Sequence, residues 1–132
     1  MRKVILMLLL AAVISSAIAE EWVAVSYTDD GGVTVYADPS TLRKEGNIVS
    51  LWTLGDFKKA EQIGNSKHVM SLKEQYEYDC KEQQMRRIHA AKYSENMGRG
   101  KEIDSSPIHE GWQEVPPSSL NEQMWRFACG KM

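Results

Sequence analysis

Alternating apolar and polar positions predict a β-strand through the middle of the chain, over residues 68–80. One set of alternate positions ends with Tyr76, Tyr78 and Cys80, while the interleaved positions are polar. Because side chains alternate between the two faces of a strand, these three residues are expected to share a buried face, with Glu74 nearer its margin. Tyrosine also favours the strand conformation.

A helical period replaces the alternation near the C-terminus. Ser119 and Glu122 have the spacing of a capping box, in which both side chains bind free amide groups at a helix start. The apolar positions that follow at helical spacing are Leu120, Met124, Phe127 and Ala128. Gly130 is a natural stop. Cys129 is therefore expected in the last turn of a helix that packs on the sheet face carrying Cys80.

The remaining pattern is one of short apolar runs separated by turn residues. Further strands are predicted over residues 22–27, 33–37, 48–57, 83–93 and 101–106, of which 83–93 would also tolerate a helix. A flexible turn is expected over 96–100 and an extended, proline-rich connector over 107–118.

Two segments are predicted to leave the sheet. Asp38 can cap a short helical turn over residues 38–42, with Pro39 at its first position. Residues 58–67 are polar and are expected to form a loop or one irregular helical turn. Strands in succession followed by one helix predict an α+β fold, a mostly antiparallel sheet of about five to six strands with the C-terminal helix on one face.

Residues 1–19 have the pattern of a secretory signal peptide: a positive start, an apolar run over 4–14 and an A-x-A ending. We expect cleavage between Ala19 and Glu20, which leaves residues 20–132 as one mature domain. The alternative is an uncleaved membrane anchor, but the run is shorter than the ~20 residues that a span needs. No cysteine follows the run to carry a lipid. The mature protein is expected in the periplasm, at the cell surface or in the medium, without a membrane span.

Export changes the interpretation of the two cysteines. In a cytosolic chain Cys80 and Cys129 would more often be free thiols, whereas in an exported domain two cysteines usually pair. The chain-entropy model assigns a stabilisation of about 4 kcal/mol to a disulfide across such a separation. Without Arg2 and Lys3, the mature domain has 14 basic and 18 acidic residues. This acidic balance argues against general nucleic-acid binding, which needs a basic surface.

The sequence contains no recognisable catalytic or metal-binding motif. His68, His89 and His109 lack metal-ligand spacing, and no serine lies in a G-x-S-x-G elbow. The glycines at 98 and 100 are better explained by a turn than by a phosphate-binding loop. We therefore expect no metal, no cofactor and no enzymatic activity.

Aromatic residues on the predicted strands are interpreted as core rather than as a ligand platform, because aromatic side chains readily fill sheet faces. These residues are Trp22, Trp52, Tyr76 and Tyr78. Two placements of Trp112 remain open: it seals the sheet edge, or it is exposed in the proline-rich connector.

Three basic residues near the second half of the chain are candidates for partner binding, namely Lys81, Arg86 and Arg87. Arg86 and Arg87 are adjacent in a strand and must point to opposite faces. One interpretation is that they are solvated and ion-paired with Glu77 or Glu82, which contributes little. The other is a basic spot that attracts an anionic partner.

An ordered set of short motifs resembles the surface-adhesin protein E-like domain of bacterial envelope proteins over nearly all of the mature chain. In order, these motifs are Trp22, Tyr36-Ala-Asp38-Pro39-Ser40-Thr41-Leu42, Val49-Ser-Leu-Trp52, Glu77-Tyr-Asp79-Cys80, Tyr93, Met97-Gly98-Arg99-Gly100, Trp112-Gln-Glu-Val-Pro116-Pro117-Ser118 and Cys129. The resemblance implies a mostly antiparallel sheet whose C-terminal helix is tethered by a disulfide, which Cys80 and Cys129 match. It also implies surface adhesion, since some relatives bind host matrix proteins such as vitronectin and laminin.

The functional hypothesis is a non-enzymatic binding module of the bacterial envelope, adhesin-like, that holds an extracellular-matrix or envelope protein. The alternatives are a small periplasmic enzyme with an unrecognised site and a structural accessory of an envelope assembly. The binding surface is expected on the sheet side opposite the helix. Loops around Lys81 and over residues 98–101 are the next candidates, since functional residues collect in loops at strand ends.

Overall fold

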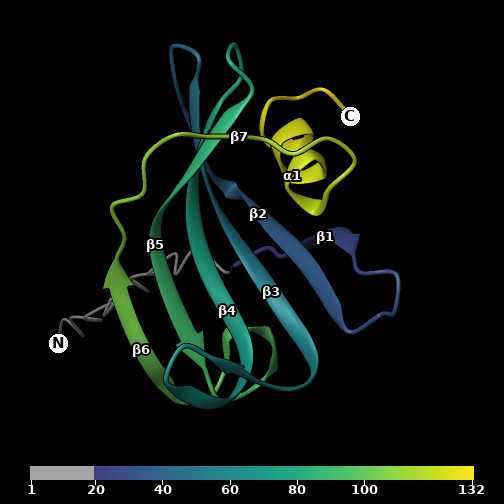
Figure 1. The fold of residues 1–132 in the computed structure, drawn as a ribbon, viewed down its shortest axis with the longest axis vertical. Helices are drawn as coiled ribbons and strands as arrows, with labels where there is room; N and C mark the ends of the chain where they lie inside the picture. The colour runs from purple at the N-terminus through teal and green to yellow at the C-terminus, as the bar shows by residue number, and fades with distance from the viewer. Residues whose placement is uncertain (1–19) are drawn as a thin grey trace, which may run out of the picture.

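The computed structural model describes residues 20–132, and the expected signal peptide, with Ala19 of its cleavage site, lies outside this range. Seven strands form one antiparallel sheet, and a C-terminal helix packs against it (Figure 1). The strands are β1 (Val23–Tyr27), β2 (Val33–Glu45), β3 (Ile48–Ile63), β4 (Ser66–Asp79), β5 (Gln84–Tyr93), β6 (Glu102–Pro107) and β7 (Gln113–Glu114). The helix, α1, spans Leu120–Ala128. The predicted α+β fold is confirmed.

The first six strands form a meander in which each strand pairs with its neighbour in sequence. The short β7 pairs with β5, beyond the end of β6. The turns at Gly46 and Gly64 require glycine, because both have a positive φ, of 60° and 59°. The proline-rich connector is extended, as predicted, and β5 is a strand rather than the alternative helix.

The polar segment 58–67, expected to be a loop, instead prolongs the β3–β4 hairpin to a tip at Gly64. Residues 58–62 are all exposed. A strand that projects beyond the core has solvent on both faces, so the apolar alternation that marks a strand in the sequence disappears. Backbone pairing continues regardless, with register shifts between Asp56 and Glu61 and between Glu61 and Ile63.

The helical turn expected over residues 38–42 is also wrong, because β2 continues through this segment with a register break between Asp38 and Arg43. The carboxylate of Asp38 does bind a local amide, since Oδ1 accepts from the Ser40 backbone N–H at 3.0 Å. It stabilises a bulge instead of a helix start. The Thr41 hydroxyl accepts the Trp52 N–H at 3.0 Å, a bond that helps to hold β3 across the irregular stretch.

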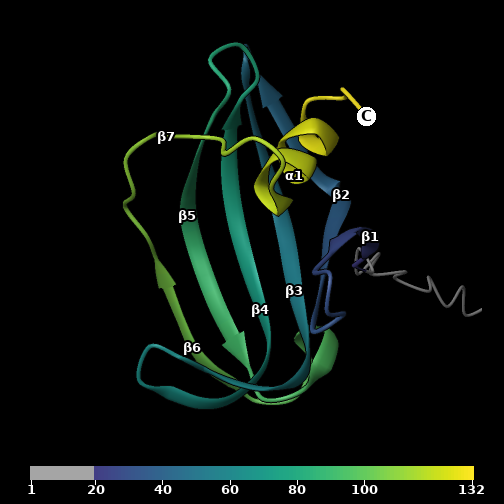
Figure 2. The same cartoon turned by 45° about the vertical axis from the view of Figure 1, so that its right-hand side comes forward.

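One face of the sheet, called here the helix face, forms the main core with α1 (Figure 2). The buried residues of this core are Ala37, Val49, Leu51, Tyr78, Met85, Met124, Trp125 and Ala128. Trp125 is anchored at both ends of its side chain, since its ring is 3% exposed and its indole N–H donates to the Asp79 carbonyl at 2.9 Å. Tyr78 is in the core, as predicted.

The helix begins at the predicted cap. Ser119 Oγ accepts from the Glu122 backbone N–H at 3.1 Å. The Glu122 carboxylate returns to the Ser118 N–H at 3.1 Å, one residue earlier than a capping box requires. Gly130 follows with a φ of 67°, so only glycine ends the helix here without backbone strain.

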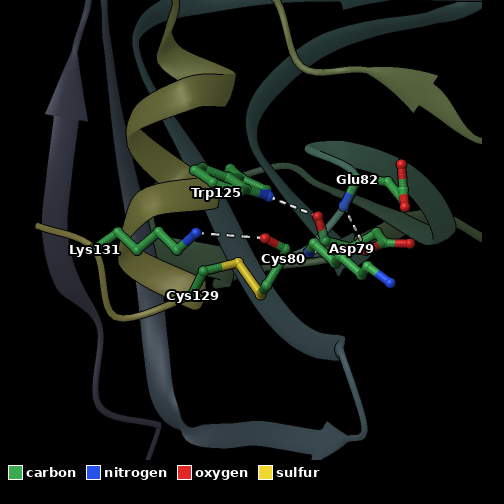
Figure 3. The surroundings of a disulfide bond; sticks show 7 residues. Asp79, Cys80, Glu82, Trp125, Cys129 and Lys131 are labelled. Carbon is green, nitrogen blue, oxygen red and sulfur yellow. Dashed lines mark hydrogen bonds between the residues drawn. A yellow bond between two sulfur atoms is a disulfide. The ribbon is translucent and has the colours of Figure 1, made fainter.

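A Cys80–Cys129 disulfide joins the end of β4 to the end of α1, and the predicted pairing is confirmed (Figure 3). The two Cα atoms are 5.6 Å apart although the residues are separated by 49 positions. Beside the bond, Lys131 Nζ donates to the Cys80 carbonyl at 3.4 Å and lies 4.8 Å from the Trp125 ring centre. The C-terminal segment is thus held to the β4–β5 turn by covalent, polar and cation–π contacts.

A bulge in β5 decides which side chains reach each face. Arg87 pairs with Tyr76 and His89 pairs with Gln75, so Ile88 is an extra residue without a partner on β4. Arg87 therefore points to the helix face, and His89 points to the opposite face, called here the open face. Without the bulge, positions 87 and 89 would point the same way.

A short 3₁₀ turn over Asn96–Gly98 covers the open face at the end of the sheet remote from α1. Ser71, which is fully buried, donates its hydroxyl hydrogen to the Glu95 carbonyl at 2.6 Å and accepts from the Gly98 N–H at 2.8 Å. The segment expected to be a flexible turn is therefore tied to β4.

Candidate functional site

The open face carries a hollow of about 330 Å³. It lies between residues 20–22, which precede β1, and the strands β2 to β6. It is lined by Glu20, Trp22, Asp38, Thr41, Trp52, Lys73, His89, Ala91, Tyr93, Glu102 and Ser105. We call it the aromatic hollow. It is on the sheet side that was expected to bind a partner.

Two tryptophans assigned to the core from the sequence belong to this hollow instead. Trp52 lies between Leu51 and Thr53, both of which are buried on the helix face, so alternation turns its ring to the open face. It is half-buried and contacts the His89 ring edge-on, with the ring centres 5.4 Å apart. Trp22, just before β1, is also half-buried. The alternation around Trp52 was the signal that could have placed it correctly.

Lys73 is held at the wall of the hollow by aromatic rings and one carboxylate. Its ammonium nitrogen lies 5.0 Å from the Tyr93 ring centre and 5.8 Å from that of Trp22. The same nitrogen is 2.5 Å from Glu20 Oε1, and the lysine side chain is only 15% exposed. Lys73 and Glu20 therefore neutralise each other, and the rings beside them already hold a cation.

Asp38 is the most deeply buried acidic residue of the hollow, at 2% exposure, and pairs across the strands with Trp52. Its Oδ1 accepts from the Ser40 N–H at 3.0 Å and from the Ser40 hydroxyl at 2.6 Å. Within residues 20–132, Oδ2 makes neither a hydrogen bond nor an ion pair. It is not a fully buried atom, so it keeps some contact with the solvent of the hollow and is free to bind a ligand.

The rim of the hollow toward β6 is polar. The Tyr93 hydroxyl donates to Glu102 Oε1 at 3.5 Å. Partial burial, and then the charge of Glu102, raise the pKa of Tyr93. Next to this pair, His89 Nε2 lies 2.8 Å from the Ser105 hydroxyl oxygen. This contact could not be predicted from the sequence, because the two residues are 16 positions apart and belong to no motif.

Arg86, one of the predicted partner-binding residues, lies outside the hollow and is already paired. It contacts Glu77 Oε1 through Nε and through a terminal nitrogen, each at 2.8 Å. Its guanidinium carbon lies 4.4 Å from the Trp112 ring centre. Trp112 is half-buried and its ring lies against Arg86 of β5, so it is not fully exposed in the connector.

Arg87 points to the helix face and is paired twice. Its terminal nitrogens contact Glu74 Oε2 at 2.8 Å and Glu110 Oε1 at 2.9 Å. Burial alone would lower the pKa of Arg87, but its hydrogen bonds and attraction to Glu74 and Glu110 outweigh burial and raise it. Arg86 and Arg87 thus point to opposite faces, and the predicted pairing with Glu77 is made by Arg86.

Lys81 differs from the two arginines because it is exposed in the β4–β5 turn, with no ion pair among residues 20–132. Its backbone N–H donates to Asp79 Oδ1 at 3.0 Å, which orders the turn beside the disulfide. Arg99 and Lys101, in the other predicted loop, are exposed too.

Across the part of the chain that the structure describes, no three His, Cys, Asp or Glu side chains are grouped so that they could hold a metal ion.

Comparison with known proteins places these features in a family context. The model of the family described as surface-adhesin protein E matches residues 22–130. No curated protein sequence matches the chain. Among residues 20–132, no helix has the length and apolar character needed to cross a bilayer.

The chain also has the fold of protein E from Haemophilus influenzae. Crystal form II of that protein matches with a TM-score of 0.59 and 12% sequence identity, covering 83% of this chain and 96% of that one. Protein E from non-typeable Haemophilus influenzae matches with a TM-score of 0.58 and 14% identity, covering 84% of this chain and 85% of that one. At such low identity, the likeness concerns the fold alone.

Proposed function

Because the chain belongs to the surface-adhesin protein E family and is an adhesin-like envelope protein, we propose that it is a non-enzymatic module that holds a protein partner on its open face. One observation carries the proposal. The helix α1 covers one part of the helix face, whereas the open face presents the aromatic hollow with Trp22, Trp52 and Tyr93 around it.

Half-buried aromatic side chains suit this role. Binding energy in protein interfaces is concentrated in a few residues, and tryptophan and tyrosine are prominent among them. Trp22, Trp52 and Tyr93 are each fixed in place by the sheet or by contact with Lys73 or His89, so little side-chain freedom is lost when a partner covers them.

Lys81 and Arg86 form the proposed second contact area, and Arg87, which points to the helix face, is a separate candidate. The charges of the two arginines are largely compensated by Glu77, Glu74 and Glu110, which leaves Lys81 as the free charge of the three within the described chain. We expect this area to contribute mainly a salt-sensitive part of binding, because exposed charges are screened within about 8 Å at physiological ionic strength.

Solid-phase binding of the purified mature domain to vitronectin and laminin, the matrix proteins that the family resemblance implies, tests the proposal. Trp52→Ala is expected to weaken binding at least about tenfold, as for an interface hot spot. Tyr27→Ala is the matched control, because Tyr27 is an aromatic residue 72% exposed and outside the hollow. Equal binding by Trp52→Ala and the wild type would overturn the assignment to the open face.

A second arm tests the basic residues. The triple variant Lys81→Ala, Arg86→Ala, Arg87→Ala is expected to bind more weakly than wild type at low salt and equally at high salt. Circular dichroism must first show that it folds, since Glu74 and Glu110 lose their partner. Binding that is equal to wild type at all salt concentrations would show that these side chains only stabilise the sheet.

The His89–Ser105 contact allows a test of the proposal that the protein is not an enzyme. A serine hydroxyl beside an imidazole can become a nucleophile, although it usually needs a third group that orients the imidazole. Within residues 20–132, no carboxylate hydrogen-bonds His89. We expect wild type and Ser105→Ala to hydrolyse p-nitrophenyl acetate equally slowly; turnover that Ser105→Ala abolishes would establish an enzyme.

A further inference from the structure

The aromatic hollow has an excess of negative charge once its internal ion pair is set aside. Lys73 and Glu20 neutralise each other at 2.5 Å. Asp38 and Glu102 remain, and neither makes an ion pair with a basic side chain among residues 20–132. Asp38 is the more buried residue of the two, and its Oδ2 faces the hollow without a partner, so it can pair with a bound cation.

The walls of the hollow favour an organic cation over a metal ion. The faces of tryptophan and tyrosine rings attract ammonium groups within about 6 Å of the ring centre. The rings of Trp22 and Tyr93 already hold the Lys73 ammonium nitrogen at such distances, so the ring considered for a ligand is that of Trp52, which pairs with Asp38 across the strands. Hard metal ions need six or more oxygen ligands, whereas the hollow offers three carboxylates, one of them paired with Lys73, and three hydroxyl groups.

An anionic ligand would find no free positive charge in the hollow. Its lysine is engaged by Glu20, and its remaining carboxylates would repel an anion. A neutral apolar ligand would cover the rings but leave Asp38 Oδ2 buried without a partner, which is unfavourable. The charge and the rings together therefore select for a positive, partly apolar group.

We infer that the aromatic hollow binds a small organic ammonium ion, with the cationic head near Asp38 and the ring of Trp52, its partner across the strands. The volume of about 330 Å³ is at the small end of the range for small-molecule sites. The inference goes beyond the proposed function, because it concerns a small molecule and requires no protein partner.

Isothermal titration calorimetry of the mature domain with choline tests the inference. The matched ligand is the uncharged carbon isostere of choline, in which a quaternary carbon replaces the nitrogen. Choline is expected to bind at least about tenfold more tightly than this isostere, since the ring faces and Asp38 recognise its charge. Sodium chloride at equal ionic strength serves as the blank. Equal affinity for both ligands, or no choline binding, would overturn the inference.

Variants locate the site. Asp38→Asn keeps the oxygen that accepts from Ser40 but removes the charge, and it is expected to weaken choline binding about tenfold or more. Asp29→Asn, in an exposed turn outside the hollow, is the control and should bind as wild type does. If Asp38→Asn does not fold, Trp52→Ala decides, because it removes the ring that lies beside Asp38. Choline binding that is unchanged in the deciding variant would contradict the site.

The same titration separates this inference from the proposed function. Choline binding by a domain that captures neither vitronectin nor laminin supports the ammonium site and counts against matrix binding. Capture of a matrix protein without choline binding overturns the ammonium site and leaves the proposed function intact.

Discussion

Both faces of the sheet carry tryptophans and charged residues, but the surroundings of these residues differ between the faces. On the helix face, Trp125 is 3% exposed and its indole N–H is bonded to the Asp79 carbonyl. The terminal nitrogens of Arg87 are bound by two carboxylates, and its Nε is buried without a hydrogen bond among the described residues. On the open face, Trp52 is half-buried and Asp38 has a carboxylate oxygen without a partner. We infer from this difference that the helix face mainly stabilises the fold and that the open face is the surface available for binding.

The disulfide also lies on the helix face and not on the open face. It joins β4 to α1 on the helix face, together with Trp125 and Lys131 (Figure 3). The aromatic hollow instead takes its residues from the chain start and five strands, with no covalent tie to α1. We infer that the helix face carries most of the stabilisation and that the open face can therefore keep half-buried rings and an unpaired charge.

The largest expected effect compares the two tryptophans directly. Trp125→Ala is expected to lower the free energy of unfolding by about 3–5 kcal/mol, because it removes a buried ring and a hydrogen bond. Trp52→Ala should cost about 1 kcal/mol, since the ring is already partly in solvent. Urea denaturation followed by circular dichroism measures both. Similar losses in the two variants would contradict the division between the faces.

The disulfide gives the next effect. Cys80→Ser with Cys129→Ser is expected to lower the free energy of unfolding by about 2–5 kcal/mol, because the unfolded chain regains the freedom of a 49-residue separation. The variant should keep the choline affinity of the wild type as long as it is folded, since the hollow does not touch α1. Lost affinity in a folded double variant would show that the faces are coupled.

Much of the fold was predictable because local signals agreed with the tertiary structure. The alternation through Tyr76 and Tyr78, the cap at Ser119 and the pairing of Cys80 with Cys129 were each predicted correctly. In these places the hydrophobic pattern, the cap chemistry and the covalent bond all favour the same arrangement. The polar tip of the β3–β4 hairpin was missed because a strand with solvent on both faces has no apolar alternation.

The hollow could be predicted only in part. Alternation around Leu51 and Trp52 gives the face of one ring, but the bulge at Ile88 reverses alternation in β5. That single extra residue brings His89 to the open face and Arg87 to the helix face, and no turn residue marks it. The pairing of Arg87 with Glu110 likewise depends on the path of the connector, which the sequence does not specify.

The smallest expected effect at neutral pH concerns Tyr78, the buried aromatic hydroxyl of the helix face. Burial, and then the neighbouring Tyr76 and Glu74, raise the pKa of Tyr78 well above its ordinary value. Because the unfolded chain releases this proton near pH ~10 and the folded chain holds it, stability is fully present below pH ~10 and falls as pH rises above it. Tyr76, whose pKa is also raised, first by burial and then by Glu74, adds to this loss.

Tyr78→Phe removes the ionisable group and keeps the ring. None of the hydrogen bonds among residues 20–132 uses the Tyr78 hydroxyl, so at pH 7 the variant should differ from the wild type by less than about 1 kcal/mol. Between pH ~9 and ~11 its unfolding free energy should fall less steeply than that of the wild type. Urea denaturation across this range measures both slopes, and Tyr27→Phe is the control because its side chain is exposed. Equal slopes for Tyr78→Phe and the wild type would mean that the Tyr78 hydroxyl ionises as readily in the folded chain as in water, and that the helix face is less completely closed than its packing indicates.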